Sequence, residues 1–337
     1  MPHIRVYAGT AGHSAWFSDD LGETWVHPNS HSGLYLEARV WAFASHARTP
    51  QHLYAGTDQG LYQWDEGTAR WSALESPARE VWAIALDPDE PARLIIGARP
   101  AALFASPDAG RSWRKLDAPG MAEFSPVNRG PTRVTQILFD PFQGDTVWAS
   151  VEIGGVYRSS DRGERWQLLG NGLVSTDMHG LAVVGKQTIL ATTNRGLHRS
   201  EDDGESWRFE KLDSPWQYTR AIVPSADGAT IFLTNGDGPP GSTGRLLASR
   251  DQGCTWQDAN LPGALNSTPW CVAVHEADPR LVFACTNLGQ MFRSEDGGES
   301  WKRLRHEFGE LRALHWRALP AELPRGEHSV TRRAVAA

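Results

Sequence analysis

Residues 200–207 read Ser-Glu-Asp-Asp-Gly-Glu-Ser-Trp, and the pattern of this octapeptide recurs along the whole chain. Its general form is S-x-D-x-G-x-[ST]-W. Five further copies follow the pattern closely: Ser18–Trp25, Ser106–Trp113, Ser159–Trp166, Ser249–Trp256 and Ser294–Trp301. Recurrence of one motif through a chain indicates a repeat architecture, in which each copy marks one structural unit.

A seventh, degenerate copy lies at residues 64–71, where the sequence is Trp-Asp-Glu-Gly-Thr-Ala-Arg-Trp and Glu66 is expected to take the place of the aspartate. The copies end at tryptophans that are 41 to 53 residues apart: Trp25, Trp71, Trp113, Trp166, Trp207, Trp256 and Trp301. This interval is typical of one blade of a β-propeller.

The residue types of the motif suit a tight turn. The carboxylate accepts backbone N–H groups across the turn, the glycine adopts positive φ, and the tryptophan starts the next strand and packs between sheets. We therefore expect the repeated aspartates to form turns rather than to act as catalytic acids: Asp20, Asp108, Asp161, Asp202, Asp251 and Asp296.

The sequence around each motif predicts a four-stranded meander. One example runs through Val81–Leu86, Leu94–Gly97 and Leu103–Ala105, followed by a short strand from Trp113. Comparable first strands are expected near Val40, Val134, Leu181, Ala221, Cys271 and Ala313.

The two ends of the chain complement each other. The N-terminal blade starts directly at a second strand, Val6–Gly9, whereas Leu311–Trp316 resembles a first strand with no motif after it. The C-terminal strand is thus expected to join the N-terminal blade and close the ring. The prediction is an all-β fold, a single seven-bladed β-propeller of four-stranded antiparallel blades over residues 1–319, with a flexible tail at 320–337.

Composition limits the class of partner. The 337 residues are 40% hydrophobic and 22% charged, with a net charge of −7, which disfavours a broad surface for nucleic acid or anionic membrane. The start of the chain lacks the apolar stretch of a secretory signal, and three sparse cysteines have no metal-ligand spacing: Cys254, Cys271 and Cys285. We expect a cytoplasmic protein with reduced thiols.

In such a ring, the loops before the innermost strands and the turns between second and third strands share one face, here called the top face. The beginnings of the innermost strands supply Arg39, Arg79, Arg133, His179, Arg220, Trp270 and Arg312. Arginines gathered at one channel mouth would bind carboxylate or phosphate oxygens. Alternatively, some point sideways and pair with Glu37, Glu80 or Glu310, because a one-residue slip in register reverses side-chain direction.

Turns between second and third strands add further polar groups to the top face. Asp58, Asn194 and Asn287 are candidate ligand contacts, and Glu152 and Asp237, with His179, are candidates for proton transfer. Carboxylates beside these amides could bind a hard cation such as Ca²⁺, but no spacing specifies a metal site or a cofactor.

The repeated octapeptide resembles the Asp-box, or bacterial neuraminidase repeat, and the resemblance covers almost the whole chain. It implies a propeller related to sialidases, xyloglucan hydrolases, sortilin-type receptors and photosystem II assembly factors. Sialidases use an arginine triad and a tyrosine nucleophile, whereas none of the six tyrosines here has such a setting. Xyloglucan hydrolases place their acids between two propellers, while the assembly factors are similar in blade number and size and have an arginine-rich surface.

Three hypotheses about function follow. The first is a propeller that binds a small anionic ligand, either a carboxylate, a phosphate or an acidic sugar, and that could act as a hydrolase or lyase. The second is a non-catalytic assembly scaffold that grips an acidic protein segment with the same arginines. The third, prompted by the repeat, is a sialidase-like glycoside hydrolase. The sequence does not determine an oligomeric state.

Overall fold

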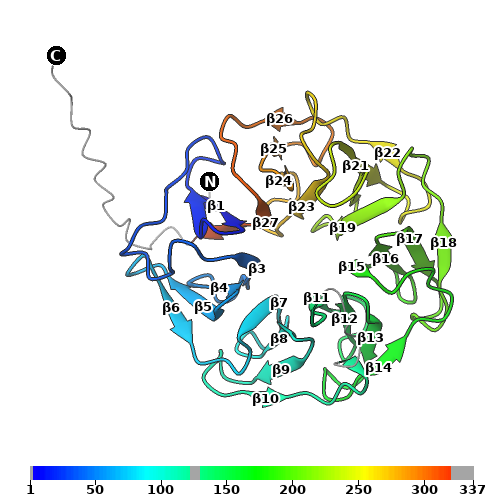
Figure 1. Ribbon diagram of the computed structural model, residues 1–337, viewed down its shortest axis with the longest axis horizontal. Coiled ribbons are helices and arrows are strands. Elements are labelled where there is room, and N and C mark those ends of the chain that lie inside the picture. Colours follow the sequence, from blue (N-terminus) through cyan, green and yellow to red (C-terminus); the bar gives the residue numbers. More distant parts are fainter. Residues whose placement is uncertain (1–2, 122–129, 320–337) are drawn as a thin grey trace.

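Seven antiparallel sheets stand around a central axis in the computed structural model, which describes residues 3–121 and 130–319 (Figure 1). Six of the sheets have four strands and one has three. The predicted all-β, seven-bladed propeller is confirmed. The described ranges contain no helix long and apolar enough to cross a membrane.

The blades are numbered from the one that contains the N-terminal strand. Blade 2 consists of β3 (Val40–Ser45), β4 (His52–Thr57), β5 (Gly60–Asp65) and β6 (Arg70–Leu74). Blade 3 consists of β7 (Glu80–Leu86), β8 (Leu94–Arg99), β9 (Leu103–Ser106) and β10 (Arg114–Lys115). Blade 4 consists of β11 (Val134–Phe139), β12 (Val147–Val151), β13 (Gly155–Ser159) and β14 (Gln167–Leu169). Blade 5 consists of β15 (Met178–Val183), β16 (Ile189–Thr193), β17 (Gly196–Ser200) and β18 (Arg208–Glu210). Blade 6 consists of β19 (Tyr218–Pro224), β20 (Ile231–Gly236), β21 (Gly244–Ser249) and β22 (Gln257–Asp258). Blade 7 consists of β23 (Pro269–Ala273), β24 (Val282–Thr286), β25 (Met291–Ser294) and β26 (Lys302–Arg303).

Blade 1 closes the ring, as predicted. Its order is β2 (Ala15–Ser18), β1 (His3–Thr10) and β27 (Leu311–Leu319), so that the two ends of the described chain pair in one sheet. The antiparallel register runs from His3 opposite Leu319 to Gly9 opposite Ala313. A single bridge between Phe17 and Val26 stands where the other blades have a fourth strand. The predicted tail at 320–337 lies outside the described residues.

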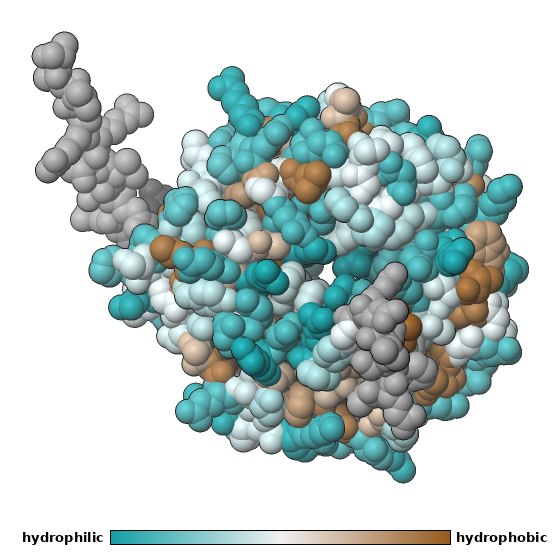
Figure 2. All heavy atoms as spheres, in the orientation of Figure 1, coloured by the Kyte–Doolittle hydropathy of each residue, from teal (hydrophilic) through white to brown (hydrophobic). Residues whose placement is uncertain are grey.

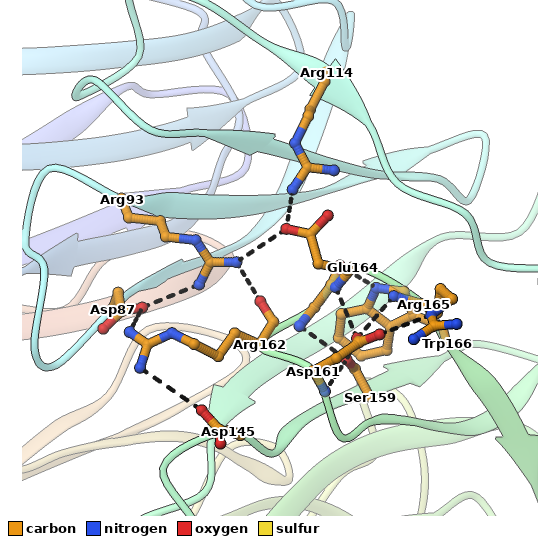
Figure 3. A network of polar contacts seen from close by, with 11 residues as sticks. Asp87, Arg93, Arg114, Asp145, Ser159, Asp161, Arg162, Glu164, Arg165 and Trp166 are labelled. Carbon is orange, nitrogen blue, oxygen red and sulfur yellow. Dashed lines mark hydrogen bonds and ion pairs between the residues drawn. The ribbon is translucent and has the colours of Figure 1, made fainter.

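The repeated turns have the expected structure. In blade 4, the Ser159 hydroxyl donates to Asp161 at 2.8 Å and accepts the Gly163 N–H at 2.8 Å, while Asp161 accepts the Arg165 N–H at 2.9 Å (Figure 3). Burial alone would raise the pKa of Asp161, but the hydrogen bonds from Arg165 and Ser159 outweigh it and lower the pKa to about 2. These carboxylates are turn-formers.

A buried carboxylate joins neighbouring blades beside this turn. Asp87, at the end of the innermost strand of blade 3, is fully buried and accepts hydrogen bonds from Arg93 at 3.0 Å and Arg162 at 2.5 Å. Arg162 belongs to the turn of blade 4 (Figure 3). Apolar clusters fill the remaining space between sheets, as where Trp166 packs with Ile95 and Val147.

The degenerate turn in blade 2 differs from the prediction. Asp65, not Glu66, accepts the backbone N–H of Thr68 at 2.7 Å and its hydroxyl at 2.9 Å. Without the serine and glycine of the motif, the strand pairing continues through Asp65 opposite Arg70, and the turn shifts. Glu66 instead reaches blade 1, where it forms ion pairs with Arg5, at 2.7 Å, and Arg317.

Candidate functional site

Each of the seven innermost strands has a β-bulge near its beginning. At the bulge the innermost strand has one residue more than the neighbouring strand that it pairs with. The bulged residues are Trp41, Trp82, Thr135, His179, Arg220, Trp270 and Arg312, with Ala221 sharing the bulge in β19. All seven line the central cavity. Bulges re-aim side chains and are common beside functional sites, so this repeated feature builds the channel wall.

The cavity on the axis has a volume of about 250 Å³, and a wider mouth of about 440 Å³ adjoins it. Four residues line both: His179, Arg220, Trp270 and Arg312. The mouth adds Arg133, Glu152, Asp177, Asn194, Tyr218 and Pro239. Figure 2 shows an opening at the centre of the molecule, bordered by hydrophilic residues. The site is concave, which is the usual form of a small-molecule site.

Guanidinium groups and indole rings are interleaved around this site. The guanidinium carbon of Arg220 lies 4.3 Å from the ring centroid of Trp270, and that of Arg312 lies 5.1 Å from the same ring. Arg133 lies over Trp82 at 4.1 Å. Trp82 in turn stacks on Trp41, with centroids 4.0 Å apart and an interplanar angle of 9°. The aromatic faces hold the cations in fixed positions.

Among the residues that line the mouth, arginines outnumber carboxylates. Arg133 pairs with Glu152 at 2.5 Å, and Arg312 pairs with Glu310. In residues 3–121 and 130–319, no carboxylate lies within salt-bridge distance of Arg220. Burial, together with repulsion from Arg220 and Arg312, lowers the pKa of Arg133 to about 10. Burial likewise lowers the pKa of Arg312, so the cluster would be stabilised by an added anion.

Several buried donors around the channel have no acceptor within the described part of the chain. They are Nε of Arg133, Nε of Arg312 and the indole Nε1 of Trp41. A buried donor that has lost its water without gaining an acceptor costs free energy, and native structures contain few of them. These three donors could therefore bind the acceptor atoms of a ligand with several oxygen atoms.

His179 is a neutral hydrogen-bonding group at the bottom of the mouth. Its side chain is 5% exposed, and its Nδ1 lies 2.6 Å from the carbonyl oxygen of Thr219. Burial, followed by the charge of Arg220, lowers the pKa of His179 to about 3. A neutral ring must donate Nδ1–H to the carbonyl, which leaves Nε2 as an acceptor, 3.7 Å from Asp177.

The structure brings seven of the predicted site residues together at the cavity or its mouth: Arg133, Glu152, His179, Asn194, Arg220, Trp270 and Arg312. Both alternatives for the arginines are seen, because Arg133 and Arg312 line the mouth and also pair with glutamates. Arg39 and Arg79 are exposed and are not among the residues that line either space. In their blades the bulge directs Trp41 and Trp82 inward instead.

Two predicted ligand contacts, Asp58 and Asn287, and the proton-transfer candidate Asp237 lie outside the site. Asp58 accepts the backbone N–H of Arg39 at 3.0 Å, and Asp237 is exposed and accepts the Ser242 N–H and hydroxyl at 2.8 and 2.6 Å. These carboxylates hold their own loops. Asn287 is buried, and its backbone N–H donates to the carbonyl oxygen of Thr268 at 3.0 Å. None of the three lines the cavity or its mouth. The described residues contain no group of three or more metal-ligating side chains.

The predicted site did not include Trp41, Trp82, Thr135, Asp177 or Tyr218. A signal for the first two was present. In most blades the bulged residue stands between a buried residue and a small one, as in Val40-Trp41-Ala42, Val81-Trp82-Ala83 and Leu311-Arg312-Ala313. Superposing these triplets would have identified the inward position. Asp177 and Tyr218 lie outside the triplets and carried no such signal.

Comparison with known proteins gives relatives of low identity. No known protein-family profile matches the chain. A probable oligoxyloglucan-reducing end-specific xyloglucanase of Neosartorya fischeri is 22% identical over 326 residues, covering 78% of this chain and 40% of the relative. Xyloglucanase Xgh74A of Acetivibrio thermocellus is 26% identical over 330 residues, with coverage of 78% and 38%. The chain thus spans about two fifths of these curated relatives, which are hydrolases.

Solved structures agree on the fold. An ancestral GH74 enzyme superposes with a TM-score of 0.63 at 15% identity, covering 86% of this chain and 39% of that one. YCF48 bound to a D1 peptide superposes with a TM-score of 0.55 at 14% identity, covering 86% of this chain and 94% of that one. At these identities the likeness concerns the propeller, and function has to be argued from the site.

Proposed function

We propose that this propeller binds a small organic anion at the mouth of its central channel, and that the anion is an acidic sugar. The observation that supports binding is the surplus of donors: Arg220 has no carboxylate partner in the described ranges, and Arg133 and Arg312 each keep a buried Nε without an acceptor. A bound carboxylate would supply acceptors and relieve the repulsion between the guanidinium groups.

The remaining lining residues favour a sugar over a simple inorganic anion. Glu152 and Asp177 supply carboxylate oxygens, and Asn194 supplies an amide, in the same mouth. These groups can accept or donate hydrogen bonds to hydroxyls, while the carboxylate of the ligand lies against Arg220 and Arg312. Both guanidinium groups lie close to the Trp270 ring, and the mouth volume of about 440 Å³ suits one or two sugar rings.

Hydrolysis of a glycosidic bond is a second candidate function, favoured by the presence of Glu152, Asp177 and His179 in one mouth and by the xyloglucan hydrolases among the relatives. Glycoside hydrolases use a pair of carboxyl groups. Glu152, which Arg133 holds in the mouth by an ion pair, would act as base or nucleophile. Asp177, beside His179, would then act as the acid.

The test is a thermal-shift screen followed by calorimetry, with glucuronate, galacturonate, sialic acid, citrate and phosphate, and with glucose and xylose as neutral controls. We expect an acidic sugar to raise the Tm, and Arg220→Ala to weaken its binding by roughly 30-fold or more, the cost of truncating a buried charged contact. Arg79→Ala is the matched control, since Arg79 is exposed and outside the site.

Each outcome is informative. If no anion raises the Tm, or if Arg79→Ala weakens binding as much as Arg220→Ala, the small-ligand proposal is wrong. Binding of an acidic peptide in place of every sugar would favour the scaffold hypothesis. Release of nitrophenol from nitrophenyl glycosides of the sugars that bind, abolished in Glu152→Gln but not in Glu205→Gln, would support hydrolysis.

A further inference from the structure

Two cysteines face each other beside the central cavity. Cys271 in β23 and Cys285 in β24 are directly opposite in the antiparallel register. Residues in this relation point to the same face of the sheet, with Cα atoms roughly 4.5–5.5 Å apart. Disulfides span Cα separations of about 4.4–6.8 Å. The backbone therefore already holds these two residues at a separation at which a disulfide can form.

The two thiols differ in access. Cys271 lines the central cavity, and it follows the bulged residue Trp270. Its S–H group donates a hydrogen bond to the carbonyl oxygen of Arg312, in blade 1, at 3.4 Å. Cys285 is 1% exposed and belongs to the apolar cluster between blades 7 and 1. A reagent in the channel would meet Cys271 first, with Cys285 directly behind it.

Their electrostatic surroundings differ in the same direction. A hydrogen bond from Cys285, and then the charges of Arg220 and Arg312, lower the pKa of Cys271 in spite of its burial. The same hydrogen bond and burial raise the pKa of Cys285. Thiolate is the reactive form of cysteine, and nearby cations favour it. Cys271 thus has the surroundings of an attacking thiol, and Cys285 those of a thiol that keeps its proton.

We propose that Cys271 and Cys285 form a redox-active pair, which a hydroperoxide entering the channel oxidises to a disulfide. The Cys271 thiolate attacks one peroxide oxygen, the O–O bond breaks, and the other oxygen leaves and is protonated to water or an alcohol, which gives a sulfenic acid. The sulfur of Cys285 then attacks that of Cys271. A sulfur–sulfur bond forms, and the hydroxyl leaves as water with the proton of Cys285. Two thiols are oxidised and one peroxide is reduced.

The inference does not depend on the proposed ligand, because thiol chemistry can be measured without any anion. The test treats full-length Cys254→Ser protein with hydrogen peroxide, alkylates the remaining thiols after denaturation, and identifies linked peptides by mass spectrometry. Cys254 is removed because it is exposed. We expect a Cys271–Cys285 disulfide that dithiothreitol reverses, and in Cys285→Ala a sulfenic acid at Cys271 that dimedone traps.

Two further variants connect the reactivity to the channel. Arg220→Ala should slow oxidation of Cys271 by roughly 3- to 10-fold, because it removes a charge that favours the thiolate. Arg79→Ala should leave the rate unchanged. The proposal is overturned if peroxide leaves both thiols free, if Cys271 is oxidised without a link to Cys285, or if Arg79→Ala slows the reaction as much as Arg220→Ala. The first two of these outcomes are measured on protein that keeps both Cys271 and Cys285, so they need no substitution that could destabilise the fold.

Discussion

Arg220 lies over the indole of Trp270, with 4.3 Å between the guanidinium carbon and the ring centroid, and both are bulged residues of adjacent innermost strands. Arg312, the bulged residue on the other side, lies 5.1 Å from the same ring. One aromatic ring therefore positions two cations from different blades. Residues that are 50 and 42 positions from Trp270 in sequence become neighbours through a feature of the strands, not of the loops.

Replacement of Trp270 tests this shared platform. Trp270→Leu should weaken binding of the acidic sugar found in the screen by roughly 2- to 30-fold, because it removes two cation–π contacts of about 0.5–2 kcal/mol in all. Trp270→Phe, which keeps an aromatic face, should retain most of the affinity. Isothermal calorimetry measures both, with Trp216→Leu, outside the cavity lining, as control. Equal losses for Phe and Leu would contradict the role of the ring.

Glu66→Gln should be strongly destabilising. The Glu66 side chain is 5% exposed and pairs with Arg5 and with Arg317, itself 2% exposed, across the boundary of blades 1 and 2. Breaking a buried ion pair leaves an uncompensated charge, and we expect a loss of about 3–5 kcal/mol in the free energy of unfolding by urea. Glu205→Gln, which breaks an exposed pair with Arg158, should cost less than about 1 kcal/mol. Similar values for the two variants would argue against the importance of this boundary.

The fold was predictable because its signals are local and repeated. The motif fixes each turn by contacts within eight residues, as in Ser159–Trp166, and the missing first strand of blade 1 could be matched with Leu311–Trp316 by elimination. Glu66 was misassigned because its partners, Arg5 and Arg317, are far away in sequence, and no local pattern distinguishes an acid that turns the chain from one that bridges two blades.

The site was only partly predictable, because a bulge changes which residue of a strand points inward. His179, Arg220, Trp270 and Arg312 were found since they happen to occupy the bulged position. In blades 2 and 3 the predicted arginines, Arg39 and Arg79, precede the bulged tryptophans by two and three residues and lie outside the site. The position of a bulge depends on how two strands pair, so one strand alone does not reveal it, whereas comparison of the repeated triplets does.

His179 should make stability depend on pH below about 6.5. Its folded pKa, about 3, lies below the unfolded value of 6.5, so its contribution is complete above pH 6.5 and is lost as pH falls, because only the unfolded chain takes up the proton. At pH 5 the loss is roughly 2 kcal/mol. Urea unfolding of His179→Gln should therefore decline less between pH 7.5 and 5 than that of the parent protein. His31→Gln, an exposed loop variant, is the control. An unchanged decline in His179→Gln would show that the ring is protonated in the folded state.

Substitution of two adjacent glycines in a repeated turn distinguishes the cost of backbone strain from the cost of tight packing. Gly297 and Gly298 both have positive φ, of 75° and 92°. A Cβ on Gly297 would meet nothing within 4 Å, whereas a Cβ on Gly298 would lie 2.6 Å from the Phe232 ring of the preceding blade. Gly297→Ala should cost about 1–2 kcal/mol, the strain of the left-handed conformation, and Gly298→Ala a further 1–3 kcal/mol for overpacking against a buried ring. Urea unfolding measures the difference. If the two variants were equally stable, the glycine of the motif would serve the turn alone, and the close approach of one blade to the next would not constrain it.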